Sequence, residues 1–325
     1  MKHGLRITIF LMLFFVLAQL AGLALVGMSI KDRVVNLETG ETSLVHDETS
    51  LGPVPEFSGF GAFTYVVIGV AVGTLLVLLI IRFKKLNLWK IWFFLAVFTA
   101  MSISIGVLVK QFYVVFAIAF VLAALKILRP NVVIHNLTEV LMYAGIAVFL
   151  VQVFNHNVLW ASLLLLAIAV YDFIAVFKSK HMVTMATFQA DNKLFAGLFI
   201  PYVTKRTDGR ATAVKTETSN ITAGKKVLPK DFKPGLEERK NAVLGGGDIA
   251  FPLIYTGIVV EKLVVDGMTK ASALGFGLII TLTTTIALAL LFTFAQKDKF
   301  YPAMPIISAG CFVGYGMIEL ARFLL

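Results

Sequence analysis

Charged residues and cysteines are both scarce in this chain of 325 residues. Only 15% of the residues are charged and 58% are hydrophobic, whereas an average soluble domain has about 25% and about 45–50%. No water-soluble fold of this length has enough interior to bury so much apolar surface, so a single soluble domain is excluded. The one cysteine, Cys311, excludes an intramolecular disulfide and a cluster of thiolate metal ligands. Nothing in the sequence indicates a metal or another cofactor.

The apolar residues are clustered in nine blocks of roughly 17–24 residues, each long enough to cross a bilayer as a helix. The sequence therefore predicts an all-α, polytopic membrane protein with nine transmembrane helices. The first block is longer than the apolar core of a cleaved signal peptide, so we interpret it as a retained span. The blocks are Ile7–Ile30, Gly61–Ile81, Ile91–Val109, Phe112–Leu128, Leu137–Phe154, Val158–Phe177, Ala242–Val260, Ala273–Phe294 and Met304–Leu325.

The distribution of lysine and arginine predicts how these spans are oriented. Basic residues mark cytoplasmic loops, and they concentrate in the loops that lie inside when the N-terminus is inside. We therefore expect a cytoplasmic N-terminus and, after nine spans, an outer C-terminus. The net charge of +10 then reflects orientation in the lipid bilayer, and no nucleic-acid partner is expected. The expected location is the cell membrane.

One segment between spans six and seven is long enough to protrude from the membrane. It divides the chain into residues 1–178 with six spans, a cytoplasmic loop over residues 179–241, and residues 242–325 with three spans. Residues 204–241 are rich in Thr, Lys, Gly and Pro, which predicts a flexible linker. The preceding stretch, from Met182 to Val203, is either an amphipathic piece on the membrane surface or the irregular end of span six.

Acidic residues inside the spans are the candidates for function, because a carboxylate at membrane depth is unfavourable. Glu319 has Arg322 three residues later on the same helical face, which predicts a local ion pair. Asp172 and Asp248 have no such partner. At 1.5 Å rise per residue, each lies ~8–9 Å from the cytoplasmic end of its span. We therefore expect these two acids at equal depth on neighbouring antiparallel helices, in one site.

Two carboxyl groups in a low-dielectric site cannot both ionise, so they are expected to share a proton. One can then act as a base toward water while the other, protonated, polarises a peptide carbonyl, which is the chemistry of aspartic proteolysis. The alternative is a proton- or cation-binding pair in a transporter or channel, which is the commoner use of such acids taken alone. A membrane scaffold, in which both acids are dispensable, is a third hypothesis.

The residues around the acids favour proteolysis. Gly245, Gly246 and Gly247 immediately precede Asp248 and leave room for another backbone to approach it, although membrane helices also use glycine for packing. Pro252 follows Asp248 by four residues. Its ring loosens the helix at the acid, unless it lies in the first turn, where proline is harmless.

The start of the last span is also unusual. Pro302 and Pro305 flank the dipeptide Ala303-Met304 and disfavour a regular helix there. This stretch lies at the cytoplasmic end of its span, so we expect it at the depth of both aspartates.

Three motifs now resemble those of one family. The family is the presenilin and signal peptide peptidase family of intramembrane aspartyl proteases. Its YD motif resembles Tyr171-Asp172, its GxGD motif resembles Gly245-x-Gly247-Asp248, and its PAL motif resembles Pro302-Ala303-Met304. They occur in the family's order, on the expected spans of a nine-span frame. The third motif has Met304 where the family usually has leucine, an apolar residue of similar volume.

The resemblance implies hydrolysis of peptide bonds within the transmembrane helices of single-span proteins or peptides. It implies that Asp172 and Asp248 are the catalytic pair, and that Pro302-Ala303-Met304 supports the site and the substrate. The glycines before Asp248 would admit a substrate held as a strand. Tyr171 would either supply a hydroxyl or pack beside the acid.

The expected orientation matches that of presenilins and is opposite to that of signal peptide peptidases. Type IV prepilin peptidases share the GxGD aspartate, but they carry a basic residue after the acid and a cysteine cluster, so they are the second protease hypothesis. The sequence leaves open whether the protein forms a homo-oligomer or needs accessory subunits.

Overall fold

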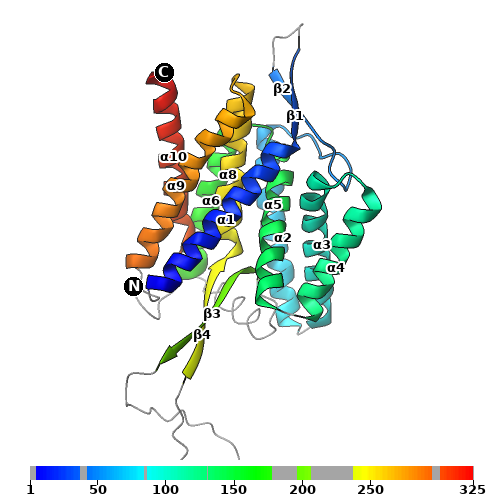
Figure 1. Ribbon diagram of the computed structural model, residues 1–325, viewed down its shortest axis with the longest axis vertical. Coiled ribbons are helices and arrows are strands. Elements are labelled where there is room, and N and C mark those ends of the chain that lie inside the picture. Colours follow the sequence, from blue (N-terminus) through cyan, green and yellow to red (C-terminus); the bar gives the residue numbers. More distant parts are fainter. Residues whose placement is uncertain are drawn as a thin grey trace, which may run out of the picture.

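The computed structural model describes residues 5–36, 42–83, 86–129, 131–177, 196–205, 237–294 and 301–324. Within these ranges the chain forms nine helices and two β-hairpins (Figure 1). The helices are α1 Leu5–Ser29, α2 Gly59–Arg82, α3 Leu86–Leu108, α4 Phe112–Leu128, α5 Val132–Phe154, α6 Val158–Phe177, α8 Gly246–Val265, α9 Lys270–Phe294 and α10 Met304–Leu324.

Seven of the helices in the described ranges are long and apolar enough to cross a membrane. The other two are α4, which has 17 residues, and α8, which carries Asp248, Glu261 and Lys262. Each predicted span overlaps one of the nine helices, so the predicted all-α, polytopic membrane fold is confirmed. Large apolar side chains cover much of the outer surface, as lipid contact requires.

Three predicted spans have ends that differ from the helices by four residues or more. The third begins at Leu86 instead of Ile91. The fifth begins at Val132 instead of Leu137, because the side chain of Asn131 accepts a hydrogen bond from the backbone N–H of Val133 (2.9 Å) and caps the helix there. The seventh begins at Gly246 instead of Ala242 and continues to Val265, because the residues before Gly246 belong to a strand.

The two hairpins were not predicted. Strands β1 (Ile30–Val35) and β2 (Thr42–His46) pair antiparallel after α1. Strands β3 (Gly197–Lys205) and β4 (Glu237–Gly245) also pair antiparallel, with Gly197 opposite Gly245. Part of the segment expected to be a linker or an amphipathic surface piece is therefore a hairpin. The amphipathic residues around Met182 lie outside the described residues.

Helix α8 is at the centre of the bundle. It is buried on most of its faces and contacts α1, α5, α6, α9 and α10. Helices α2 and α4 are peripheral, and each buries only one narrow face. The start of α1 and hairpin β3/β4 lie at one end of the bundle, whereas the end of α10 and hairpin β1/β2 lie at the other (Figure 1). Because β4 runs directly into α8, the hairpin positions the first turn of the central helix.

Candidate active site

Asp172 lies near the end of α6, where its buried side chain faces the start of α10. Its side chain is 6% exposed, and its Oδ2 accepts a hydrogen bond from the backbone N–H of Met304 at 3.1 Å. Met304 is the first residue of α10, and the first N–H groups of a helix have no partner within the helix. The positive end of the α10 dipole also favours a negative charge at this position. Asp172 is therefore bound by the N-terminus of a second helix.

The sequence Pro302-Ala303-Met304 supplies this N-terminus. Residues 301–303 are not helical, and the Ala303 carbonyl accepts the backbone N–H groups of Ile306 and Ile307 at 3.1 and 3.0 Å, which begins α10. Pro305 lies in the first turn, where its missing N–H leaves no bond broken. The expectation that both prolines interrupt the helix was wrong for Pro305. Met304 itself is buried and brings its N–H to Asp172.

Asp248 is the third residue of α8 and is partly buried. The predicted depth was wrong, because the acid lies in the first turn and not six residues into a span. The hairpin fixes the position of this first turn. Strand β4 ends at Gly245, and the backbone N–H of Gly246 bonds to the Ala196 carbonyl at 3.3 Å. Asp248 is thereby held close enough to Asp172 for their charges to repel each other. The structure thus brings the two acids into one site.

The three glycines before Asp248 have different surroundings. A Cβ atom on Gly245 would lie 3.1 Å from Oδ2 of Asp248, and one on Gly246 would lie 2.5 Å from the Tyr143 hydroxyl oxygen. A Cβ on Gly247 would meet only the Phe251 ring, at an ordinary 3.7 Å, and this residue is exposed. Packing within the protein therefore requires Gly246 most strongly, whereas Gly247 leaves an open flank beside the acid.

Pro252 does not end α8, which is a single helix from Gly246 to Val265. The proline is the seventh residue of the helix, so the harmless first-turn position is excluded, and the Asp248 carbonyl loses its usual N–H partner. The next carbonyl, that of Ile249, accepts a hydrogen bond from Nε2 of the buried Gln19 at 2.9 Å. Helix α1 thus contacts the backbone of α8 one residue beyond the acid.

Neither aspartate has a cationic partner within ion-pair distance in the part of the chain that the structure describes. The same residues hold no group of three or more histidine, cysteine or acidic side chains able to bind a metal. A pair of close carboxyl groups without a neutralising cation is expected to hold a proton between them.

Tyr171 is directed toward a neighbouring helix. Its side chain is 38% exposed, and its hydroxyl shares a hydrogen bond of 3.3 Å with that of Thr74 on α2. The contact links α6 to the peripheral α2 one residue before Asp172.

The third acid expected within a span forms the predicted local pair. Nη1 of Arg322 is 3.2 Å from Oε1 of Glu319. Nη2 of the same arginine reaches Asp266 at the end of α8, at 2.9 Å. Glu319 therefore belongs to a charged cluster at the end of the bundle away from Asp172 and Asp248.

Two buried glutamates were missed in the sequence analysis. Glu139 is the third residue of the predicted fifth span and so lies at its edge, but α5 begins five residues earlier and the side chain is fully buried. It forms an ion pair with Lys126 of α4 and accepts a hydrogen bond from the hydroxyl of Tyr143. An acid and a base at the adjoining ends of consecutive spans were the available signal for this pair.

Glu261 was missed because the seventh span was ended at Val260. Its fully buried carboxylate lies 2.6 Å from Nε2 of His46 in β2 and accepts the backbone N–H of His156 at 3.2 Å. His156 is in the left-handed region (φ 53°) in the turn between α5 and α6. Burial lowers the pKa of His156. The sequence carried no signal for the contact between His46 and Glu261, which are 215 positions apart.

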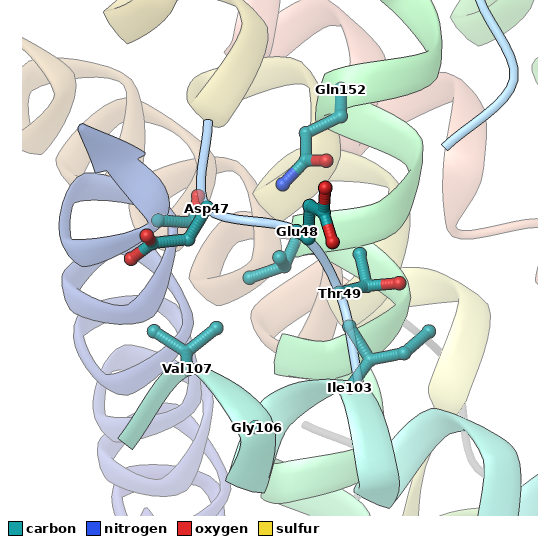
Figure 2. A pocket seen from close by; sticks show the side chains of 9 residues that line it. Asp47, Glu48, Thr49, Ile103, Gly106, Val107 and Gln152 are labelled. Carbon is teal, nitrogen blue, oxygen red and sulfur yellow. The ribbon is translucent and has the colours of Figure 1, made fainter. Parts of the chain in front are cut away.

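Two hollows lie at the end of the bundle away from Asp172 and Asp248. A cavity of about 10 Å³, room for one water molecule, is bordered by Asp47, Glu48 and the α5 residue Gln152. Figure 2 shows the Gln152 side chain reaching toward the segment that carries the two acids. A wider cleft of about 450 Å³ includes Ser162, near the start of α6, whereas Asp172 is near the end of that helix. Neither hollow belongs to the aspartate site.

Comparison with known proteins agrees with this geometry. The family model described as "Signal-peptide peptidase, presenilin aspartyl protease" matches residues 14–323. A solved structure of a presenilin family intramembrane aspartate protease has the same fold, with a TM-score of 0.57 and 17% sequence identity over 95% of this chain and 99% of that chain. No curated protein matches the chain. The family match favours proteolysis over ion transport. The chain belongs to the signal-peptide peptidase and presenilin family of aspartyl proteases, and it is an intramembrane aspartyl protease.

Proposed function

We propose that Asp172 and Asp248 are the catalytic pair of this protease. The observation that carries the proposal is their meeting at two helix N-termini with no cationic partner among the described residues. Asp172, which accepts the Met304 N–H, is the carboxylate that takes a proton from water, because donors bonded to a carboxylate stabilise its charge. Asp248 is the protonated partner that donates to the carbonyl oxygen of the scissile bond.

The reaction then follows in two steps. The oxygen of the activated water attacks the carbonyl carbon while Asp172 gains the water proton and Asp248 gives its proton to the carbonyl oxygen. The tetrahedral diol collapses when a hydroxyl proton returns to Asp248 and the proton on Asp172 passes to the amide nitrogen, which leaves as an amine. Both acids return to their starting state, so one proton shared by the pair suffices for each turnover.

The substrates we propose are transmembrane segments of single-span proteins or peptides. A helix in a bilayer keeps its peptide bonds within its own hydrogen bonds, so it must unwind locally before cleavage. Gly247 leaves the flank of Asp248 open for such an extended backbone. The edge of β4 also suits an extended backbone. Phe199 directs its N–H and carbonyl away from β4, toward Asn136. Its antiparallel partner Val243 therefore directs its own N–H and carbonyl away from β3, toward the edge. A substrate strand bound at that edge would run toward the acid.

We also propose that all nine helices span the membrane, with the N-terminus in the cytoplasm and the C-terminus outside. In this arrangement residues 1–178 and 242–325 form two membrane segments, and residues 179–241 form a loop on the cytoplasmic side. The basic loops predicted to be inside support this orientation. The aspartates and β3/β4 would then be near the cytoplasmic face of the cell membrane.

The test is cleavage of a single-span substrate by the purified protein in detergent. Asp172→Asn and Asp248→Asn should each abolish cleavage while the proteins remain folded, because each removes one partner of the proton exchange. Asp266→Asn, which changes an acid at the far end of α8, is the matched control and should retain activity. Full cleavage by either active-site variant contradicts the proposal.

The pH dependence gives a second test. Cleavage needs one carboxyl ionised and the other protonated, so kcat should rise and then fall with pH. A rate that changes in one direction only, across both titrations, is incompatible with a shared proton.

A further inference from the structure

The first turns of α5 present polar side chains toward hairpin β3/β4 and the start of α8. His135, Asn136, Glu139 and Tyr143 recur at helical spacing on this side of the helix. With Lys126 of α4 we call them the α5 seat. None of the three family motifs includes these residues, and the proposed mechanism does not use them.

Asn136 binds the main chain of β3 in the way that a neighbouring strand would. Its Nδ2 donates to the Phe199 carbonyl at 2.9 Å, and its Oδ1 accepts the Phe199 N–H at 2.9 Å. Nε2 of His135 lies 2.9 Å from the Gly197 carbonyl. The outer edge of β3 is therefore fixed to a transmembrane helix at two successive outward-facing residues.

This attachment is close to the catalytic acid along the hairpin. Gly197 pairs with Gly245, which is the last residue of β4, and the Gly246 N–H bonds to the Ala196 carbonyl. Asp248 follows two residues later. A shift of β3 relative to α5 would therefore move the first turn of α8.

The other part of the seat sets how closely that turn approaches α5. Lys126 and Tyr143 both bond to the buried Glu139, which neutralises its charge and fixes the Tyr143 ring. The ring lies directly against Gly246, where a Cβ atom would be 2.5 Å from the hydroxyl oxygen. Tyr143 is also close enough to Asp248 to interact with its charge.

We propose that Asn136 and Tyr143 are positioning residues that fix Asp248 at its working distance from Asp172. The proposal rests on the proposed catalytic role of the two aspartates. Asn136 fixes the hairpin along its strand direction, and Tyr143 fixes the separation of α8 from α5. Neither residue touches the reacting atoms, so each acts on the rate through the location of Asp248.

The first test replaces Asn136 by leucine, which has similar size and no amide. A misplacement of about 1 Å lowers catalysis about 10²-fold, so Asn136→Leu should lower kcat about 10–100-fold. KM should change less than about threefold, because the displacement of Asp248 weakens stabilisation of the transition state more than binding of the substrate. The matched control is Gln152→Met, which removes an amide at the other end of α5 and should leave both constants unchanged.

The second test removes one atom and covers the case in which Asn136→Leu does not fold. Tyr143→Phe should lower kcat about 10-fold at nearly constant KM, because the ring loses its bond to Glu139 and no longer has a fixed position against Gly246. Tyr255→Phe removes another buried hydroxyl, which is 3.3 Å from that of Ser162, and serves as the control. If Tyr143→Phe and every folded Asn136 variant match their controls in kcat, the proposal is overturned.

A third measurement separates this proposal from the proposed function, because it does not use activity. Asp172→Cys and Asp248→Cys are combined with Cys311→Ala, and the rate of crosslinking by a short bifunctional thiol-reactive reagent, a bis-methanethiosulfonate, is measured. Adding Asn136→Leu or Tyr143→Phe should slow the crosslinking several-fold, and adding Gln152→Met should not. An unchanged rate overturns the positioning role. A slowed rate in a protein whose aspartates prove dispensable for cleavage supports the positioning and rejects the proposed catalytic pair.

Discussion

The protein contains two kinds of buried acid, and their partners differ. Glu139 is bonded to a lysine and a tyrosine, and Glu261 to a histidine and a backbone N–H; both are fully buried. Asp172 is nearly as buried, but the partners found for it among the described residues are backbone N–H groups, those of Met304 and Ala303. Asp248 has Asp172 as its charged neighbour.

The difference supports the proposal that Glu139 and Glu261 are structural and that Asp172 and Asp248 are reactive. A buried carboxylate whose oxygens are bound by hydrogen-bond donors of the protein has no reason to exchange a proton. Two carboxyl groups that face one another can lower their energy only by sharing one, and a shared proton is available for chemistry. The same helix, α8, carries one acid of each kind near its two ends.

The largest effect expected on stability comes from removing the cation of a structural acid. Lys126→Met leaves the buried Glu139 without its lysine, with the Tyr143 hydroxyl and, at 3.8 Å, His135 as its neighbours, and should cost up to about 3–5 kcal/mol of unfolding free energy. Lys110→Met, which breaks the exposed pair with Asp47, should cost less than about 1 kcal/mol. Denaturation of both variants in detergent measures the difference. Equal stabilities would show that the Glu139 pair is not structural, and the comparison would fail.

Asp172→Asn provides the opposite case in the same measurement. It relieves the repulsion between two acids and leaves an amide oxygen to accept the Met304 N–H, so the unfolding free energy should stay within about 0.5 kcal/mol of the wild type or increase. A loss as large as that of Lys126→Met would mean that Asp172 is a structural acid.

The features of the fold and of the site that could be predicted from the sequence are local ones. The limits of α4 and α6 follow from their apolar runs, and the place of Asp172 near the end of α6 follows from its distance to Phe177. The Glu319–Arg322 pair follows from a spacing of three residues on one helix. Each of these features depends on neighbours in the chain.

The rest depends on contacts between distant segments. Strands β3 and β4 are separated by residues 206–236, and neither has the clean apolar alternation that marks a strand, so the hairpin was missed and α8 was started at Ala242. The polar residues His135 and Asn136 also look like a loop before a span. Their function as partners of the β3 backbone appears only when the hairpin is in place.

A smaller effect should distinguish two adjacent glycines. Gly246→Ala introduces a Cβ against the Tyr143 ring and should lower stability by about 1–3 kcal/mol. Gly247→Ala meets no close atom and should be neutral or stabilising by up to about 1 kcal/mol, since alanine favours a helix. If Gly247 admits the substrate, however, Gly247→Ala should lower kcat/KM although the protein is stable. Equal stabilities of the two variants would contradict the assigned contact with Tyr143.

Another small effect concerns an acid that is paired but exposed to water. The hydrogen bond from Lys110 holds the pKa of the Asp47 carboxyl below its usual value. A folded-state pKa below the unfolded one stabilises the protein at pH values above the unfolded pKa of about 3.9, and this contribution is lost as the pH falls through the folded-state pKa. Because the pair is exposed, it contributes only about 0.2–1 kcal/mol.

Asp47→Asn should therefore be slightly less stable than the wild type at pH 7, and the difference should close as the pH falls below about 4. The measurement is the unfolding free energy of both proteins in detergent across this range. Asp32→Asn is the control, since this exposed acid on β1 has no ion pair with any described residue. Asp47 and Glu139 are both paired with a lysine, but only Glu139 is fully buried. A loss at Asp47 as large as that at Lys126 would mean that pairing without burial is enough to make an acid structural.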